Sequence, residues 1–358
     1  MPPTKPYPTR QLGRNGPTVS AIGYGTMGIG VWYGTPRTDA EAQELLTTAL
    51  DRGQNLWDTS DCYGTAEKAI GKWFAANPTR RSEVFLCSKF GACNFTKTLV
   101  DDFVPDSDPR YVRVALYRSL YMLQTDYIDL YYQHRVDPKV PVEVVMEALR
   151  DPLERGLIRW IGLSECSAAD LRRAKAVPGV GDRIIATQVE FSPFSLDIRD
   201  NGIAETAKEL DLAVVAYAPL GRGLFSGQFR SRVDFQEGDC RLILPRWTEE
   251  NFPKNLVLVD QMKEIADRLN IKVGQLTLAW ILAQDPDWIP IPGGLSVEHV
   301  LENADAAEIK LAPEDIQLVN KLVEQATGTV SGTRYPEELL YTLYADSPPL
   351  SSWKGSKE

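Results

Sequence analysis

Residues 55–64 have the sequence NLWDTSDCYG, in which a short apolar run ends at Asp58 and a phenol, Tyr63, follows five positions later. Two further apolar runs lead in the same way to Lys89 and then to His134. A carboxylate, a phenol, an amine and an imidazole therefore follow three predicted strands. Because active-site side chains of parallel α/β folds gather at the carboxyl ends of the strands, we predict that these four share one site.

The chain around this stretch alternates between short apolar runs and helical patterns. Residues 39–52 carry apolar side chains at helical spacing and end at Gly53, where a left-handed cap residue is expected. Eight such units occur, with predicted strands at 19–25, 56–57, 84–87, 127–132, 158–163, 184–189, 213–217 and 288–291. Short, almost wholly apolar strands are typical of a parallel sheet covered by helices on both faces. The sequence therefore predicts an α/β fold of the (β/α)8 TIM barrel type, spanning about residues 18–325.

Three segments lie outside this alternation, within what we interpret as a single domain of residues 1–358. The segment before residue 18 has the composition of an N-terminal cap or hairpin. A long loop, residues 221–254, follows the seventh predicted strand and carries five arginines, as expected for a lid or a binding wall. The C-terminal tail covers about residues 326–358, and we expect its first half to pack and its end to fray.

Composition excludes several classes of protein. A net charge of −10 disfavours nucleic acid and anionic membranes as partners, because both require a concentrated basic surface. No run of eighteen apolar residues and no apolar signal segment is present, so we expect a cytoplasmic protein. The five cysteines form no C-x-x-C pair, which indicates free thiols and no structural metal. The sequence leaves the oligomeric state open.

The four candidate side chains suit proton transfer to a carbonyl oxygen. A free tyrosine has a pKa of about 10, so a proton donor such as Tyr63 needs a nearby cation to bring its pKa toward neutrality, and Lys89 is the candidate. Asp58 can hold that lysine in an ion pair. His134 can donate a hydrogen bond to the substrate oxygen and set its orientation.

These residues and their order resemble the aldo-keto reductases, and the resemblance runs from about residue 10 to about residue 325. It identifies Asp58, Tyr63, Lys89 and His134 as the family's tetrad, with Tyr63 as the general acid. It implies a (β/α)8 barrel that reduces aldehydes or ketones with a nicotinamide cofactor, or oxidises alcohols in the reverse direction.

The same resemblance implies a cofactor site assembled from several strand ends. Its expected members are Gly25, Thr26, Met27 and Asp58; Ser164, Glu165 and Gln188; Tyr217, which would stack on the nicotinamide; Pro219, Leu220, Gly221, Arg222 and Gly223; and Gly293, Gly294, Leu295, Ser296, His299, Glu302 and Asn303. We expect the phosphates near the long loop and the helix predicted over residues 297–304.

Three features depart from the family's usual pattern. Glu165 stands where many relatives have asparagine to hold the carboxamide. Leu295 and Ser296 stand where basic residues are usual, and only His299 offers positive charge nearby. A 2′-phosphate requires charge-assisted donors, so NADP(H) is the family default while NAD(H) or dual use is an open hypothesis. Cys62, directly before Tyr63, has no role that the sequence explains.

The expected substrate is a small carbonyl compound, and no metal is implied. We predict a substrate pocket of Trp32, Tyr33, Tyr63 and His134, approached over Trp32, the 91–107 loop and the tail. Two other functions remain alternatives. One is a cofactor-binding regulatory or redox-sensing subunit of the same fold. The other is a barrel hydrolase or lyase that works through paired carboxylates, although no suitably placed pair is evident.

Overall fold

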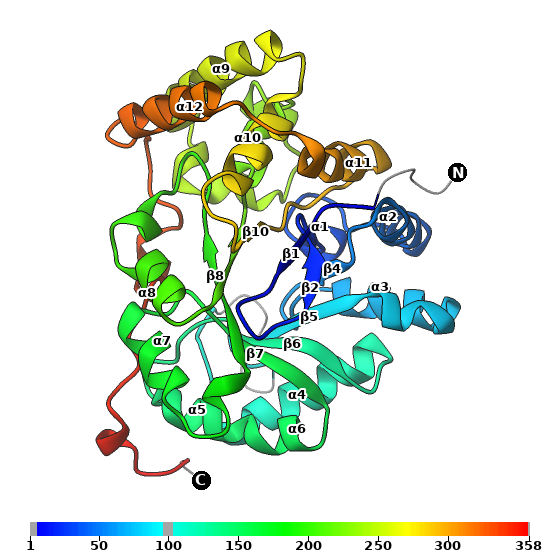
Figure 1. Cartoon of the computed structure of the whole chain (residues 1–358), viewed down its shortest axis with the longest axis vertical. Coiled ribbons are helices and arrows are strands. Elements are labelled where there is room, and N and C mark those ends of the chain that lie inside the picture. Colours follow the sequence, from blue (N-terminus) through cyan, green and yellow to red (C-terminus); the bar gives the residue numbers. More distant parts are fainter. Residues whose placement is uncertain (1–5, 96–102, 357–358) are drawn as a thin grey trace.

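Eight parallel strands form the centre of the protein in a computed structural model that describes residues 6–95 and 103–356 (Figure 1). Each strand from β3 to β10 pairs with the next one along the chain. The sheet closes because the Gly23 and Gly25 amides donate to the Pro290 and Pro292 carbonyls, each at 3.0 Å. The predicted (β/α)8 barrel is therefore confirmed.

The barrel strands are short, and helices of varied length connect them. The strands are β3 (Tyr24–Gly25), β4 (Leu56–Asp58), β5 (Phe85–Phe90), β6 (Ile128–Gln133), β7 (Ile158–Ser164), β8 (Ile184–Glu190), β9 (Ala213–Tyr217) and β10 (Trp288–Pro290). The helices are α1 (Met27–Gly30), α2 (Asp39–Arg52), α3 (Ala66–Ala76), α4 (Pro109–Leu123), α5 (Val142–Ala148), α6 (Arg150–Glu154), α7 (Ala168–Lys175), α8 (Ile203–Glu209), α9 (Asn251–Arg268), α10 (Val273–Leu282), α11 (Val297–Asp305) and α12 (Pro313–Ala326).

Alternation along each strand determines which side chains fill the barrel. In β4, Leu56 belongs to the inner apolar cluster, whereas Trp57 packs with the helices outside. Tyr132 of β6 fills the interior opposite Gly162, where an added Cβ would lie 2.2 Å from the tyrosine ring. Because side chains along a strand alternate between the two faces, the next inward residue after Leu56 is Asp58, at the end of the strand.

An antiparallel hairpin closes the amino-terminal end of the barrel. Strands β1 (Thr9–Gln11) and β2 (Thr18–Ser20) pair with each other and lie across the ring of strands in Figure 1. Leu12 and Val19 are fully buried in the inner cluster. The predicted cap is confirmed as a hairpin, but the strand predicted over 19–25 is wrong as one element, because residues 21–23 separate β2 from β3. The opposite end of the barrel is left for chemistry.

The long segment after β9 is built from short 3-10 turns rather than extended loop. These turns are η4 (Gly221–Ser226), η5 (Arg232–Asp234), η6 (Cys240–Ile243) and η7 (Pro245–Trp247). Helix α9 starts at Asn251, earlier than the predicted end of the loop, because Thr248 accepts from the amides of Asn251 and Phe252 and starts the first turn. Cys240 donates its amide to the Trp32 carbonyl at 2.9 Å, so this segment reaches the α1 loop.

The C-terminal tail packs further along its length than the sequence indicated. Its Ala345 lies in a parallel bridge with Cys166, just beyond β7. Ser347 is buried, and it accepts from the Val142 amide at the start of α5 and donates its own amide to Asp170. The five cysteines are all free, as predicted. Across residues 6–95 and 103–356, no helix has both the length and the apolarity needed to cross a membrane.

Candidate active site

Lys89 is at the centre of the candidate site. It is an inward residue of β5 and its side chain is completely buried. Its Nζ donates to Asp58 Oδ1 at 2.5 Å, to the Thr59 carbonyl at 2.8 Å and to the Tyr63 hydroxyl at 3.3 Å. One ammonium therefore joins the carboxylate and the phenol that the sequence placed five residues apart.

Asp58 is held on both carboxylate oxygens. Gln188 of β8 donates its side-chain amide to Asp58 Oδ2 at 2.9 Å, while Lys89 occupies Oδ1. The Asp58 carbonyl accepts from both the amide and the hydroxyl of Thr26, each at 2.9 Å. The ion pair is therefore rigidly placed, and satisfying both oxygens offsets part of the cost of burying the charges.

Tyr63 follows β4 in the loop that leads into α3, and its hydroxyl reaches Lys89. The pKa of Tyr63 is raised well above its usual value, first by burial and then by the negative charge of Asp58. This corrects our expectation that Lys89 brings the pKa of the phenol toward neutrality. The reason is that burial disfavours the phenolate, and the nearby Asp58 carboxylate adds to this effect, so the phenol remains a protonated donor.

His134 lies edge to face against Tyr63, with 5.7 Å between ring centroids. Burial, with Arg135 and Lys89 nearby, lowers the pKa of His134 well below its usual value, so the imidazole is neutral. Its Nδ1 lies 3.0 Å from Ser60 Oγ and 3.5 Å from Cys62 Sγ. With Nδ1 in contact with these partners, the other nitrogen, Nε2, is the one left to face a substrate.

Cys62 thus acquires a structural explanation as a buried neighbour of this histidine. Burial raises the pKa of its thiol, so it is not poised as a nucleophile. Ligand-type atoms of Asp61, Cys62 and His134 all lie within 4.8 Å of one another. The prediction that no metal is required stays a prediction.

Aromatic residues form a wall beside Tyr63. Trp32 lies 5.8 Å from Tyr63 and 5.5 Å from Phe103, measured between ring centroids. Tyr33 instead lies under the guanidinium of Arg241, which is 4.8 Å from its ring centroid, so it faces the 221–250 segment. Of the predicted 91–107 approach loop, residues 96–102 lie outside the described part of the chain.

The residues expected to hold the nicotinamide lie together at the ends of β7, β8 and β9. Tyr217 donates its hydroxyl to Glu165 Oε1 at 2.7 Å. Ser164 Oγ lies 3.5 Å from the Arg135 guanidinium. Glu165 is fully buried with a left-handed backbone, at φ 52°, which turns its side chain back toward β8 and β9. Its Oε1 is therefore committed to protein partners, and the carboxylate does not face solvent.

The loop after β9 offers an arginine for a phosphate. Gly221, Arg222 and Gly223 all have positive φ, within the stretch 217–223 that also contains Pro219 and Leu220. Arg222 has no carboxylate within ion-pair distance among the described residues, and its guanidinium lies 4.9 Å from the Tyr335 ring centroid. The other arginines predicted as candidates are engaged by protein groups: Arg230 by Asp260, Arg232 by two carbonyls, Arg241 by Asp239 and Arg246 by Glu190.

The segment expected to hold the adenosine phosphate leads into α11. Ser296 caps this nine-residue helix by accepting from the His299 amide, and the His299 ring contacts the Gln228 side chain. Asn303 donates to the Gly293 carbonyl at 3.1 Å. Glu302, whose pKa is raised by burial, has His299 and Lys272 as the cations acting on it. Leu295 packs against Gly28, where an added Cβ would lie 2.7 Å from the leucine side chain. As an apolar residue, Leu295 offers no charge to a phosphate.

These donors fit a dinucleotide. A helix start, a turn with positive φ and an arginine outside the ion pairs are groups that bind phosphates, and they lie beyond the strand ends that carry Tyr217 and Gln188. Gly25 Cα faces the Ile291 carbonyl so closely that an added Cβ would lie 2.8 Å from it. This close backbone approach explains the glycine in the predicted segment Gly25, Thr26 and Met27.

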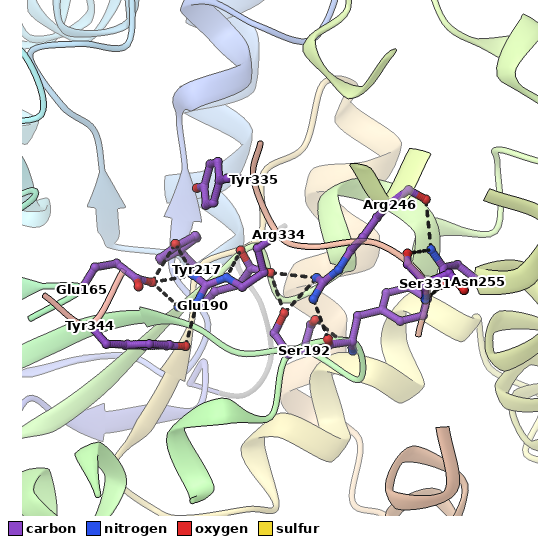
Figure 2. A network of polar contacts seen from close by, with 12 residues as sticks. Glu165, Glu190, Ser192, Tyr217, Arg246, Asn255, Ser331, Arg334, Tyr335 and Tyr344 are labelled. Atoms are coloured by element: carbon purple, nitrogen blue, oxygen red, sulfur yellow. Dashed lines mark hydrogen bonds and ion pairs between the residues drawn. The ribbon is translucent and has the colours of Figure 1, made fainter. Parts of the chain in front are cut away.

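The sequence analysis missed four residues of this region, Arg135, Glu190, Arg334 and Tyr335. Arg135 donates to the Tyr335 hydroxyl, and Glu190 and Arg334 form an ion pair at the strand ends, where Figure 2 shows them. For two of them, the sequence position could have indicated a place in the site. Arg135 directly follows His134, and Glu190 shares the inward period of Gln188. The tail residues gave no such indication, because no periodic pattern ties residues 334 and 335 to the barrel.

A closed barrel whose strand ends gather a buried lysine ion pair, a tyrosine and a histidine defines a class of enzymes that work at that end of the fold. Comparison with known proteins identifies the class. A family model described as "Aldo/keto reductase family" matches residues 21–324, and this chain belongs to that family.

Curated relatives match along almost the whole chain. It is 42% identical over 352 residues to "Aldo-keto reductase str7" of Strobilurus tenacellus, covering 96% of this chain and 99% of that protein. It is 43% identical over 347 residues to "Aldo-keto reductase yakc [NADP(+)]" of Schizosaccharomyces pombe, covering 96% and 98%. Among solved structures, the thermostable aldo-keto reductase Tm1743, in complex with the inhibitor epalrestat, is 29% identical with a TM-score of 0.70, covering 88% of this chain and 99% of that one.

Proposed function

We propose that this protein reduces aldehydes or ketones to alcohols, with Tyr63 as the general acid and Lys89, Asp58 and His134 assisting it. The observation that carries the proposal is the contact of one buried ammonium, Lys89 Nζ, with both Asp58 and the Tyr63 hydroxyl. Family membership supports carbonyl reduction as the general reaction. A bound nicotinamide cofactor would supply the hydride.

Each side chain has a task that its surroundings permit. Tyr63 holds its proton because burial raises its pKa, so it donates that proton only as negative charge develops on the carbonyl oxygen. The Lys89 ammonium, 3.3 Å away, stabilises the phenolate that forms. Neutral His134 donates a hydrogen bond to the same oxygen and orients it. Trp32 packs edge to face against Tyr63 and would limit the access of water from that side.

We propose NADP(H) as the cofactor, with weak discrimination against NAD(H). The name of the yakc relative, which specifies NADP(+), supports the first part. The second part follows from Leu295 and Ser296, which give a 2′-phosphate no charged donor and leave His299 and Lys272 as the basic groups around Glu302. The nicotinamide would lie against Tyr217, near Ser164 and Gln188, and the phosphates near Arg222 and the start of α11.

The test is kinetic. The protein should consume NADPH as it reduces members of a panel of aromatic aldehydes. The kcat/KM with NADH should be lower than that with NADPH by a modest factor. A large preference for NADPH would contradict the weak-discrimination part. Binding of either nucleotide without turnover of any carbonyl compound would contradict the reductase and favour the regulatory subunit.

A further inference from the structure

Glu165 is the position at which this chain departs from the asparagine usual in the family, and the structure shows what the carboxylate contacts. Its Oε1 accepts from the Tyr217 hydroxyl at 2.7 Å, from the Glu190 amide at 3.2 Å and from Arg334 Nη2 at 2.7 Å. Its Oε2 has no hydrogen-bond partner among the described residues. One oxygen is saturated by protein donors, and the other is a buried acceptor that a primary amide would satisfy.

Arg334 comes from the C-terminal tail and is only 7% exposed. Besides Glu165, it donates to the Tyr217 hydroxyl at 2.7 Å and to the Tyr344 hydroxyl at 2.7 Å, and its Nε lies 3.2 Å from Glu190 Oε2 (Figure 2). It therefore neutralises two buried carboxylates and holds the tyrosine expected to carry the nicotinamide ring. Two adjacent buried carboxylates without this cation would repel each other.

The tail is fixed on both sides of Arg334. Before it, Ser331 exchanges two hydrogen bonds with the Asn255 side chain of α9, at 2.8 and 2.9 Å. After it, the Ala345 amide donates to the Glu165 carbonyl at 3.0 Å, and the Ser167 amide donates to the Ala345 carbonyl at the same distance. The guanidinium thus reaches the strand ends from a segment that is anchored to two separate parts of the barrel.

We propose that Arg334 is a positioning residue of the cofactor site, so that the C-terminal tail supplies part of the nicotinamide pocket. It orients the Tyr217 ring through the hydroxyl and binds Glu165 through Oε1, which leaves Oε2 to accept from the carboxamide nitrogen. In this chain a glutamate and a tail arginine together replace the neutral amide usual at this position. The inference rests on the proposed function, because it assigns Arg334 to a nicotinamide cofactor.

The test compares cofactor binding in Arg334→Met with that in a matched control. Arg246 is a suitable control because it is also a largely buried arginine paired with Glu190, at 3.2 Å, but it contacts neither Tyr217 nor Glu165. NADPH affinity would be measured by nucleotide fluorescence, with Tm recorded for each variant. We expect Arg334→Met to weaken NADPH binding about tenfold or more, since charge-assisted contacts are lost, and Arg246→Met to change it less than about threefold.

Charge compensation separates positioning from general folding. In a Glu165→Gln background Arg334 no longer has the Glu165 charge to neutralise, although it still contacts Tyr217 and Glu190, so adding Arg334→Met should weaken NADPH binding less than it does in the wild-type background. Arg334→Lys should retain part of the affinity. If Arg334→Met fails to fold, Tyr217→Phe tests the same link, because it removes only the hydroxyl that Arg334 and Glu165 hold, and it should weaken NADPH binding.

Several results would overturn the proposal. Unchanged NADPH affinity in Arg334→Met with a lowered Tm would show that the arginine only stabilises the tail. Equal weakening in Arg246→Met would show a general effect. Tighter binding would show that the tail competes with the cofactor. If the wild-type protein binds neither NADPH nor NADH, the proposed function itself fails, and this outcome is distinct from binding that is insensitive to Arg334.

Discussion

Replacing Lys89 with methionine tests whether its charge acts on chemistry or only on folding. The ammonium is completely buried and contacts Asp58, Thr59 and Tyr63 at 2.5, 2.8 and 3.3 Å. Lys89→Met leaves the Asp58 carboxylate buried with Gln188 as its remaining side-chain donor. Breaking a buried ion pair in this way costs roughly 3–5 kcal/mol of unfolding free energy.

A double variant separates the two effects. Lys89→Met with Asp58→Asn removes both charges, so the free energy of unfolding should recover most of that loss. Activity should not recover, because Tyr63 still has no cation to stabilise its phenolate, and kcat should stay about 10²- to 10⁴-fold below wild type. Urea denaturation gives the stability, and steady-state aldehyde reduction gives kcat.

The result that would refute this reasoning is a double variant that regains both its stability and its kcat. Near wild-type kcat without any charge at position 89 would show that the ion pair is structural and that Tyr63 does not depend on it. A single variant as stable as wild type would contradict the burial argument instead.

Three further predictions follow from burial and packing. The kcat/KM for carbonyl reduction should be flat from about pH 6 to 9, because burial raises the pKa of Tyr63 and lowers that of His134, moving both out of this range; a break near pH 6.5 or 8.5 assignable to either residue would contradict it. Despite burial, which alone would raise it, the pKa of Glu190 is lowered to about 2 by Arg334, Arg246 and Arg222, from an ordinary 4.5. This carboxylate therefore contributes stability above pH 4.5 that is lost as the pH falls from 4.5 toward 2, roughly 3 kcal/mol, and Glu190→Gln should flatten that part of the acid-unfolding curve; an unchanged curve would contradict the assignment. Gly162→Ala should destabilise the fold by about 1–3 kcal/mol or more in chemical denaturation, because its Cβ would lie 2.2 Å from the Tyr132 ring; an unaffected variant would show that the barrel interior yields at this point.

The barrel could be predicted because its signal is local and repeated. Each strand is a short apolar run, and each helix carries a periodic apolar face, so the order of elements followed from the sequence alone. Asp58, Lys89 and His134 could be placed for the same reason, since a period of two puts them at the inward end of β4, β5 and just beyond β6. The ends of strands were less predictable, because residues 21–23 interrupt what the sequence indicated as one strand over residues 19–25.

The tail and the electrostatics required the structure. Arg334 reaches Glu165 across 169 positions of sequence, and nothing in the local pattern of residues 330–347 indicates that contact. The pKa of Tyr63 was predicted in the wrong direction because the sequence pairs it with Lys89 but shows neither how deeply the phenol is buried nor how close Asp58 lies to it. Cys62 gained a neighbour, His134, only once β4 and β6 were folded together.

The measurement that tests the central claim most directly is the single-turnover rate of aldehyde reduction in Tyr63→Phe, with NADPH binding measured in parallel. The variant removes one oxygen and keeps the ring against Trp32 and His134. We predict that cofactor affinity stays within a few-fold of wild type while the reduction rate falls by at least about 10²-fold. A Tyr63→Phe protein that reduces aldehydes at the wild-type rate would contradict Tyr63 as the proton donor.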